Sequence, residues 1–348
     1  MGNTVISNIR WVGRYIKNHM FQGATILIYH RVAELPSDWQ LMSVTPQHFG
    51  EHLDVLRKKF YPMSLQQLHR AAQKGKIPKG AVAVTFDDGY ADNLYNAKPL
   101  LEKYDVPASF YVTCGCLDQE QEFWWDDLDR MLLQPQSLPQ TLTLTVEGIE
   151  HSWKVDVPSN PSPSTEIVPP KFSKIQEEGK LGRKELYRSL HSLLRPLPEE
   201  KRRPLLDEIA KWSGSNRKGR VTHASLTTNE LEQLGKGGLV EIGAHTVTHP
   251  VLSSLSLSEQ RDEILQSKEG LEEKLNRPIL SFAYPYGERS DYSVQTPELV
   301  KQLGFSYACS NYSGIVRRGV DPFQLPRVST RDWNGEEFSR RISTWFPV

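Results

Sequence analysis

Two adjacent carboxylates, Asp87 and Asp88, directly follow an apolar run at residues 81–86 and are themselves followed by Gly89. Neighbouring side chains on a strand point to opposite faces, so these two can converge on one site only where the strand gives way to a turn. Converging carboxylates repel each other unless a cation balances their charge. The pattern therefore predicts a cation site at the end of this strand.

Two histidines four residues apart, His245 and His249, follow a second apolar run at residues 239–243. They would meet on one face of a helical turn, and a neutral imidazole nitrogen binds divalent metals well. An isolated pair of this kind is common on protein surfaces, but here both motifs follow predicted strands. Two imidazoles and one of the two aspartates would leave coordination positions open for water and substrate, which is typical of a catalytic metal. Zinc fits such a site best, and cobalt or nickel would also suit it.

Seven short apolar or β-branched runs predict the strands that position these residues. They are residues 25–29, 81–86, 108–113, 239–243, 280–284, 305–308 and 324–328. Helical patterns separate most of them, at residues 46–59, 91–104, 258–275 and 297–303. The recurring order of strand, helix and strand predicts a parallel sheet. Seven units favour an α/β barrel with its chemistry at the carboxyl ends of the strands, and an open doubly wound sheet is the alternative.

Residues 116–224 do not follow this order of strand, helix and strand and are interpreted as an inserted α+β segment on the loop after the third strand. They contain an aromatic and acidic helix at 123–128, an alternating stretch at 141–146, a Pro/Ser-rich run at 158–164 and a charged helical stretch at 184–212. Because that loop opens at the active-site end of a barrel, we expect the insertion to form a lid or a wall of the substrate cleft.

Three stretches resemble the first three motifs of the polysaccharide deacetylase family, also called the NodB homology domain or carbohydrate esterase family 4. They read TFDDG at 85–89, HTVTH at 245–249 and FAYPYG at 282–287. The resemblance spans residues 25–115 and 225–330 and leaves the insertion uncovered. It implies a distorted (β/α)7 barrel over residues 25–348 and an enzyme that deacetylates amino sugars with a metal. Independently of the resemblance, the spacing of apolar residues predicts a helix in residues 1–24.

The resemblance also implies roles for single residues. Asp88, His245 and His249 would bind the metal, and Asp87 would be the general base that activates the attacking water. The backbone N–H of Tyr286 would bind the oxyanion, which suits a turn where the preceding proline cannot donate.

Two departures from the family pattern leave roles to be filled. The third motif usually carries an arginine that tethers the base, and the last strand usually supplies an acid histidine, but residues 325–328 read LPRV. His30, at the end of the first strand, is our candidate acid, as in the poly-N-acetylglucosamine deacetylase branch; the alternative is a histidine satisfied by a loop carbonyl. Arg327 is our candidate tether for Asp87, and a plain structural ion pair is the alternative.

Aromatic residues near these motifs are candidates for contact with a sugar. Tyr284 and Tyr286 lie in the third motif, and Trp124 and Trp125 lie just past the third strand. Aromatic faces stack on sugar rings, but tryptophans in a helix are more often packing anchors. We therefore expect only one of the two tryptophans to face the cleft.

The composition sets bounds on partners and location. Lys plus Arg and Asp plus Glu both number 42 among 348 residues, so the net charge gives no reason to expect a nucleic acid. Three cysteines are too few for a disulfide framework, and no run is long enough to span a membrane, which together predict a cytoplasmic location. The pattern at 1–24 is amphipathic and fits a helix docked on its own domain or one in peripheral contact with a membrane.

The sequence thus predicts a metal-dependent hydrolase that removes an acetyl group from an N-acetylated amino sugar in a glycan or a glycan precursor. An O-acetyl esterase or an amidase on a non-sugar acyl amide is the alternative, because the metal chemistry is indifferent to what lies beyond the carbonyl. An inactive carbohydrate-binding relative is a third reading, supported by the missing arginine and histidine. The identity of the sugar, its chain length, the native metal and the oligomeric state stay open.

Overall fold

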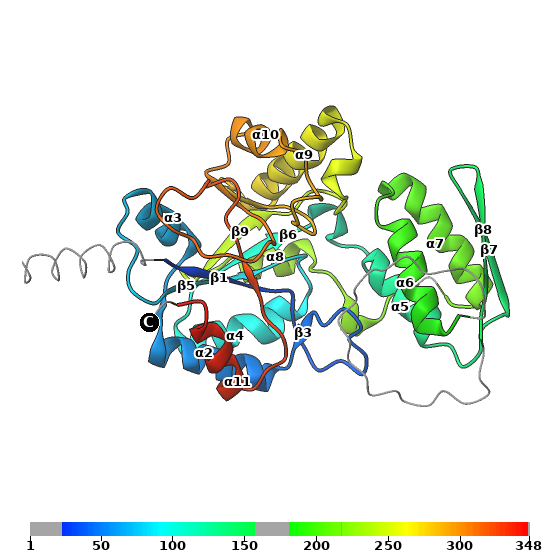
Figure 1. The fold of residues 1–348 in the computed structure, drawn as a ribbon, viewed down its shortest axis with the longest axis horizontal. Coiled ribbons are helices and arrows are strands. Elements are labelled where there is room, and N and C mark those ends of the chain that lie inside the picture. Colours follow the sequence, from blue (N-terminus) through cyan, green and yellow to red (C-terminus); the bar gives the residue numbers. More distant parts are fainter. Residues whose placement is uncertain (1–22, 157–180, 217, 347–348) are drawn as a thin grey trace, which may run out of the picture.

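The computed structural model of the chain describes residues 23–156, 181–216 and 218–346 (Figure 1). The predicted helix in residues 1–24 and the Pro/Ser-rich run at 158–164 lie outside the described residues, except for the last two residues of the former. The described chain forms a barrel with a smaller lobe beside it. Among the described residues, no helix combines the length and the apolar character that crossing a bilayer requires.

Parallel strands form the barrel. Seven of them lie in the order β11 (Tyr307–Cys309), β10 (Ser281–Ala283), β9 (Val240–Ala244), β6 (Ala108–Val112), β5 (Ala81–Phe86), β1 (Thr25–Tyr29) and β12 (Val328–Ser329). Short β4 (Tyr61–Pro62) also pairs with β5, and β2 (Arg31–Val32) pairs with β3 (Ser43–Val44). A parallel bridge between Cys309 and Leu325 joins the two ends of the order and closes the ring. The predicted α/β class and distorted (β/α)7 barrel are therefore confirmed.

The last predicted strand, residues 324–328, is shorter and later than expected. Leu325 bridges to Cys309, but only Val328–Ser329 pair as a strand with β1. Between them stands Pro326, which has no N–H to give to a ladder. The barrel is thus closed by an irregular segment at this point.

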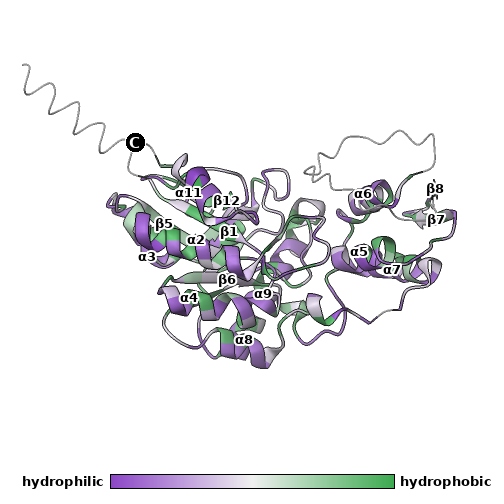
Figure 2. Ribbon diagram, turned by 90° about the horizontal axis from the view of Figure 1, so that it is seen from below, coloured by the Kyte–Doolittle hydropathy of each residue, from purple (hydrophilic) through white to green (hydrophobic). Residues whose placement is uncertain are grey.

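Helices follow most of the strands and cover the outside of the barrel. They are α2 (Pro46–Lys59), α3 (Leu65–Gln73), the π-helical turn η1 (Asn93–Ala97) with α4 (Lys98–Tyr104), α8 (Thr228–Leu234), α9 (Leu257–Leu275), α10 (Thr296–Gln302) and α11 (Gly335–Ser343). Short 3-10 turns are η2 (Cys114–Cys116), η3 (Val221–His223) and η4 (Leu252–Ser254). Several helices begin at a Ser or Thr whose side chain accepts a hydrogen bond from the first turn, as Ser256 does from Glu259. Seen from below, the barrel helices carry hydrophilic residues on their outer surfaces (Figure 2).

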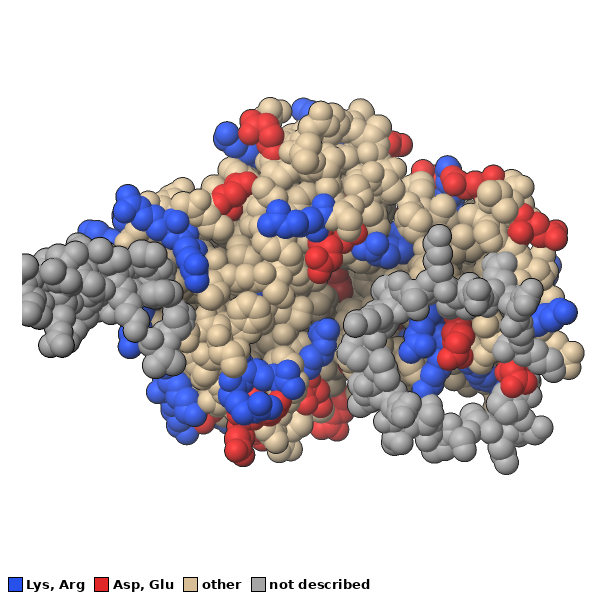
Figure 3. All heavy atoms as spheres, viewed as in Figure 1, with Lys and Arg blue, Asp and Glu red and all other residues tan. Residues whose placement is uncertain are grey.

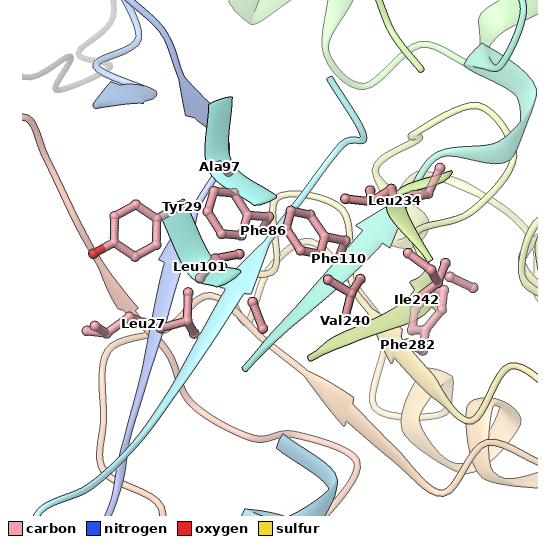
Figure 4. Packing of buried hydrophobic residues seen from close by; sticks show 14 of the residues in the cluster. Leu27, Tyr29, Phe86, Ala97, Leu101, Phe110, Leu234, Val240, Ile242 and Phe282 are labelled. Atoms are coloured by element: carbon pink, nitrogen blue, oxygen red, sulfur yellow. The ribbon is translucent and has the colours of Figure 1, made fainter. Parts of the chain in front are cut away.

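Alternation along the strands decides which side chains reach the inside of the barrel. Tyr29, Phe86 and Phe110 of three neighbouring strands form one row beneath the helices, with ring centroids 5.3 and 4.6 Å apart (Figure 4). Each such buried side chain contributes about 1.5–3 kcal/mol to the free energy of unfolding. On β5, Phe86 points outward, and the alternate residues Ala81, Ala83 and Thr85 point into the barrel. The next inward position after Thr85 is Asp87.

The lobe comprises α5 (Trp124–Leu133), β7 (Thr141–Val146), β8 (Ile149–Lys154), α6 (Arg183–Leu194) and α7 (Glu199–Ser213), with a hydrophobic core of its own. β7 and β8 form an antiparallel hairpin whose turn residues Glu147 and Gly148 both have positive φ, as a tight hairpin turn requires. The charged stretch at 184–212 is two helices rather than one, because Pro196 and Pro198 interrupt it.

Candidate active site

Three predicted metal ligands meet at the carboxyl end of the barrel strands. Asp88 Oδ1 lies 3.5 Å from His245 Nε2 and 3.4 Å from His249 Nε2. All three side chains are buried, and their donor atoms lie within 4.8 Å of one another. One carboxylate oxygen and two imidazole nitrogens at this spacing suit a divalent transition metal.

Left-handed backbone conformations bring neighbouring side chains into the same site. Four non-glycine residues here have positive φ: Asp88 (75°), Thr246 (65°), His249 (57°) and Tyr286 (60°). Such residues are uncommon outside glycine, and they gather at functional sites. At Asp88 this turn follows β5 at once, so the carboxylates of Asp87 and Asp88 both reach the pocket instead of pointing to opposite faces.

The two histidines are oriented by the backbone and by α9. His245 Nδ1 lies 2.8 Å from the Ala283 carbonyl, which can only accept, so Nδ1 carries the hydrogen and Nε2 keeps a free lone pair. The turn between the histidines is a bend rather than the helical turn that their spacing suggested. Glu263 of α9 closes this bend, because its carboxylate accepts hydrogen bonds from Val247 N at 2.8 Å and Thr248 N at 3.0 Å.

A buried arginine holds the second aspartate. Arg327 Nη1 and Nη2 each donate to one oxygen of Asp87 at 2.6 Å, and Arg327 Nε donates to the Ser310 carbonyl at 2.8 Å. Burial would raise the pKa of Asp87, but Arg327 lowers that pKa below its ordinary value. Burial also opposes ionisation of Asp88, but the neighbouring imidazoles of His245 and His249 lower its pKa well below the usual range. Both carboxylates are therefore ionised at neutral pH.

His30 and Tyr286 lie at the same pocket. Burial lowers the pKa of His30, and the charges of Asp88 and Asp87 oppose that effect. The Tyr286 ring meets the His249 ring edge to face, with centroids 4.7 Å apart. Within the described part of the chain, the Tyr286 N–H donates to no backbone carbonyl.

The pocket has a volume of about 670 Å³ and lies between the barrel and the lobe, where Figure 3 shows a hollow. Of the two tryptophans, Trp125 lines it and donates from Nε1 to the Tyr90 hydroxyl at 2.8 Å. Trp124 does not line it, since its ring packs against His191 and Arg202 inside the lobe. The expectation that only one tryptophan faces the pocket agrees with this placement.

The placement of Tyr284 corrects our expectation that it contacts substrate. Tyr284 follows β10 at the same alternation as Phe282, so it points outward into the core beneath the helices. It is fully buried, its hydroxyl donates to the Phe323 carbonyl at 2.7 Å, and its ring stacks on Tyr292. Tyr284 therefore has a packing role.

One face of α6, within the insertion that we expected to form a lid or a wall of the cleft, forms a wall of the pocket from residues that sequence reasoning did not identify. The wall consists of Tyr187, Arg188, His191, Ser192 and Arg195. Their spacing follows the helical period, but the sequence offers no sign of what this face would meet. Two contacts fix the wall to the barrel: Gln40 Nε2 donates to the Tyr187 hydroxyl at 2.7 Å, and Arg195 pairs with Asp291 at 2.6 Å.

Residues 74–140 and 209–308 match the family model described as polysaccharide deacetylase. The poly-beta-1,6-N-acetyl-D-glucosamine N-deacetylase of Escherichia coli K12 is 34% identical over 88 residues, which are 25% of this chain and 13% of the relative's length. The protein of the same name from Staphylococcus epidermidis is 36% identical over 73 residues, 20% of this chain and 25% of that relative. The chain thus covers only a small part of these relatives.

Solved structures share the fold over nearly the whole chain. Streptococcus pyogenes deacetylase PplD, solved in complex with acetate, has a TM-score of 0.56 at 18% identity and covers 94% of this chain and 99% of its own. IcaB from Ammonifex degensii has a TM-score of 0.57 at 18% identity, with 94% and 98% covered. At such identity the likeness concerns the fold.

Proposed function

Because the chain belongs to the polysaccharide deacetylase family, we propose that it is a metal-dependent hydrolase of N-acetylated amino sugars within a glycan or a glycan precursor. The observation that carries the proposal is the grouping of Asp88, His245 and His249 beside an Asp87 that Arg327 holds. The names of the similar proteins support the substrate class, and the pocket beside the grouping offers room for a short saccharide.

Asp88, His245 and His249 are the residues that would hold one divalent ion, and zinc suits this donor set best, with cobalt or nickel also suitable. When bound, such an ion lowers the pKa of a water molecule towards about 7 and polarises an acyl carbonyl. The tautomer of His245 fits this role, because its Nε2 faces Asp88 with the lone pair free.

Asp87 is our general base. It is ionised, it lies beside the ligand group with Oδ2 3.9 Å from His245 Nε2, and it cannot rotate while both its oxygens are bonded to Arg327. Each carboxylate oxygen keeps a further lone pair, so Asp87 can still accept a proton from the attacking water. In this role Arg327 replaces the arginine that the third motif lacks.

Tyr286 and His30 would complete the reaction. The Tyr286 N–H would donate to the oxygen of the tetrahedral intermediate, where a positioned donor is most effective. His30 would give a proton to the leaving amine. That proton would be taken up from solvent: burial lowers the pKa of the His30 imidazole, but the charges of Asp88 and Asp87 oppose this effect and favour the protonated form.

The lobe, on this proposal, is one wall of the substrate pocket and not a separate binding module. Trp125 of α5, whose ring is stacked on Phe123 on one side, and the pocket residues of α6 before Arg195 would contact the sugar.

Acetate and free amine released from a panel of acetylated compounds test the proposal. The panel should contain N-acetylated amino sugars and their oligomers, O-acetylated sugars, and acyl amides without a sugar, each with and without a chelator. We expect equal amounts of acetate and amine from the N-acetylated sugars and no release after chelation. Release from O-acetyl sugars or non-sugar amides alone would replace the proposal with an esterase or an amidase, and no release from any compound would favour an inactive relative.

A further inference from the structure

Arg195, at the end of α6, links the lobe to the turn that carries Tyr286. Its Nη2 lies 2.6 Å from Asp291 Oδ1, and its guanidinium lies over the Tyr286 ring, 4.2 Å from the centroid. The Arg195 side chain is 31% exposed, whereas that of Asp291 is only 2% exposed. A buried carboxylate of the barrel thus depends on a cation that comes from the lobe.

The turn at residues 285–291 has a conformation that needs support. Tyr286 has a φ of 60°, and the next residue, Gly287, has a φ of 71° and no room for a Cβ, which would lie 2.7 Å from Asn311 N. A left-handed non-glycine residue is strained and persists only when its surroundings hold it. Asp291 closes the turn, because its Oδ2 accepts a hydrogen bond from Glu288 N at 3.0 Å.

Two groups hold the Tyr286 ring between them. The His249 ring, which follows β9, meets the Tyr286 ring edge to face, and the guanidinium of Arg195 from the lobe lies over its face. A cation over an aromatic face is attractive, and Arg195 is itself fixed by a charge-assisted hydrogen bond to Asp291. Arg195 therefore acts on both ends of the turn, on the ring of Tyr286 and on the residue that closes the turn.

We propose that Arg195 is a positioning residue for catalysis: through Asp291 and the Tyr286 ring, it holds the Tyr286 N–H in the orientation that binds the oxyanion. The proposal rests on the function proposed above and gives the lobe a part in the reaction itself. Arg195 lies between the two segments that the family model matches, so the family match assigns it no role.

Replacement of Arg195 tests this inference against a matched control. Arg195→Met removes both the ion pair with Asp291 and the cation over the Tyr286 ring. Arg195→Lys keeps a charge for Asp291 but has no planar guanidinium to lie over the ring. The control is Arg203→Met in α7. Arg203 is 28% exposed and pairs at 3.1 Å with Asp127, which is 4% exposed, so it matches Arg195 in exposure and in having a buried partner. Its partners, Asp127 and Glu199, belong to the lobe.

For Arg195→Met we expect kcat to fall about ten- to a hundredfold, as is usual when a catalytic group is misplaced by a fraction of an ångström to one ångström. KM and metal content should stay near those of the wild type, and Arg195→Lys should recover part of kcat. Hydrogen exchange of the peptide covering residues 284–292 should become faster in Arg195→Met and stay unchanged in Arg203→Met.

Three results would overturn the inference: equal losses of kcat in Arg195→Met and Arg203→Met, a raised KM with unchanged kcat, which would make Arg195 a substrate contact, or unchanged exchange at 284–292. The exchange measurement needs no substrate. A wild type that releases no acetate would therefore refute the proposed function, while the exchange comparison would still decide whether Arg195 holds the turn.

Discussion

Replacing Arg327 separates the support of the proposed base from the rest of the site. Arg327 is fully buried, and its guanidinium makes two hydrogen bonds of 2.6 Å with Asp87. Arg327→Met keeps much of the side-chain volume but leaves the buried Asp87 without its principal partner. Arg327→Lys keeps a charge but cannot reproduce the two parallel hydrogen bonds.

The expected magnitude follows from the burial of both partners. Removing one partner of a buried ion pair costs about 3–5 kcal/mol, because the other charge is left unpaired in the interior. The double variant Arg327→Met with Asp87→Asn contains no such charge, so it should recover most of that loss. Arg327→Met and the double variant both lack an oriented base, so turnover should be about 10²- to 10⁴-fold below that of the wild type in each.

Arg327 also sets the pH range over which Asp87 is ionised. It lowers the pKa of Asp87 against the effect of burial, so in the wild type the pair stabilises the fold above the ordinary pKa of a carboxyl group. This stabilisation is lost as the pH falls through the lowered pKa. Without Arg327 the pKa of Asp87 should rise, and the acidic limb of any residual activity should move to higher pH.

Denaturant unfolding, metal content and acetate release should be measured on the wild type and on all three variants. The account requires a large loss of stability in Arg327→Met, a smaller loss in the double variant, and turnover lost in both. The reasoning is wrong if Arg327→Met is as stable as the wild type, or if the double variant is no more stable than the single one. An active Arg327→Met would remove Arg327 from the support of the base.

His30→Ala should keep its metal and slow kcat steeply for an amide but much less for an activated ester, whose leaving group needs no proton; equal losses on both substrates would contradict its role as acid. Trp125→Ala should raise KM more than Trp124→Ala, because only Trp125 lines the pocket, and equal effects on KM would count against stacking. Burial lowers the pKa of His52 to about 4, so the fold should lose about 3 kcal/mol of stability from this group as the pH falls from about 6.5 to about 4. Unfolding free energies at pH 7 and pH 4 should show that loss in the wild type and not in His52→Asn, and identical pH dependence would contradict it.

Much of the barrel and of the site could be predicted from the alternation of inward and outward side chains along the strands. Ala81, Ala83 and Thr85 face inward, so Asp87 is the next inward position, and His245 follows β9 in the same way. The same rule places Tyr284 outward with Phe282, so our expectation for Tyr284 could have been corrected from the sequence alone. The left-handed turn at Asp88 answers how two adjacent carboxylates share one site.

The sequence placed the insertion at the cleft, but it could not predict which residues of α6 form the wall. The pocket face of this helix depends on how the lobe sits against the barrel, and that position is set by single contacts such as Gln40 with Tyr187 and Arg195 with Asp291. Such contacts join residues far apart in the chain and leave no periodic signal. The amphipathic helix at 1–24 and the cytoplasmic location stay predictions.

The most direct test of the account is a zinc titration of chelator-treated protein while acetate release from an N-acetylated amino sugar is followed, for the wild type and for Asp87→Asn. We predict that both bind one ion per chain at Asp88, His245 and His249. Turnover of the wild type should rise to a plateau at that ratio, whereas Asp87→Asn should stay about 10²- to 10⁴-fold slower at saturation. Full turnover without metal would contradict the account, as would an Asp87→Asn variant that binds no zinc.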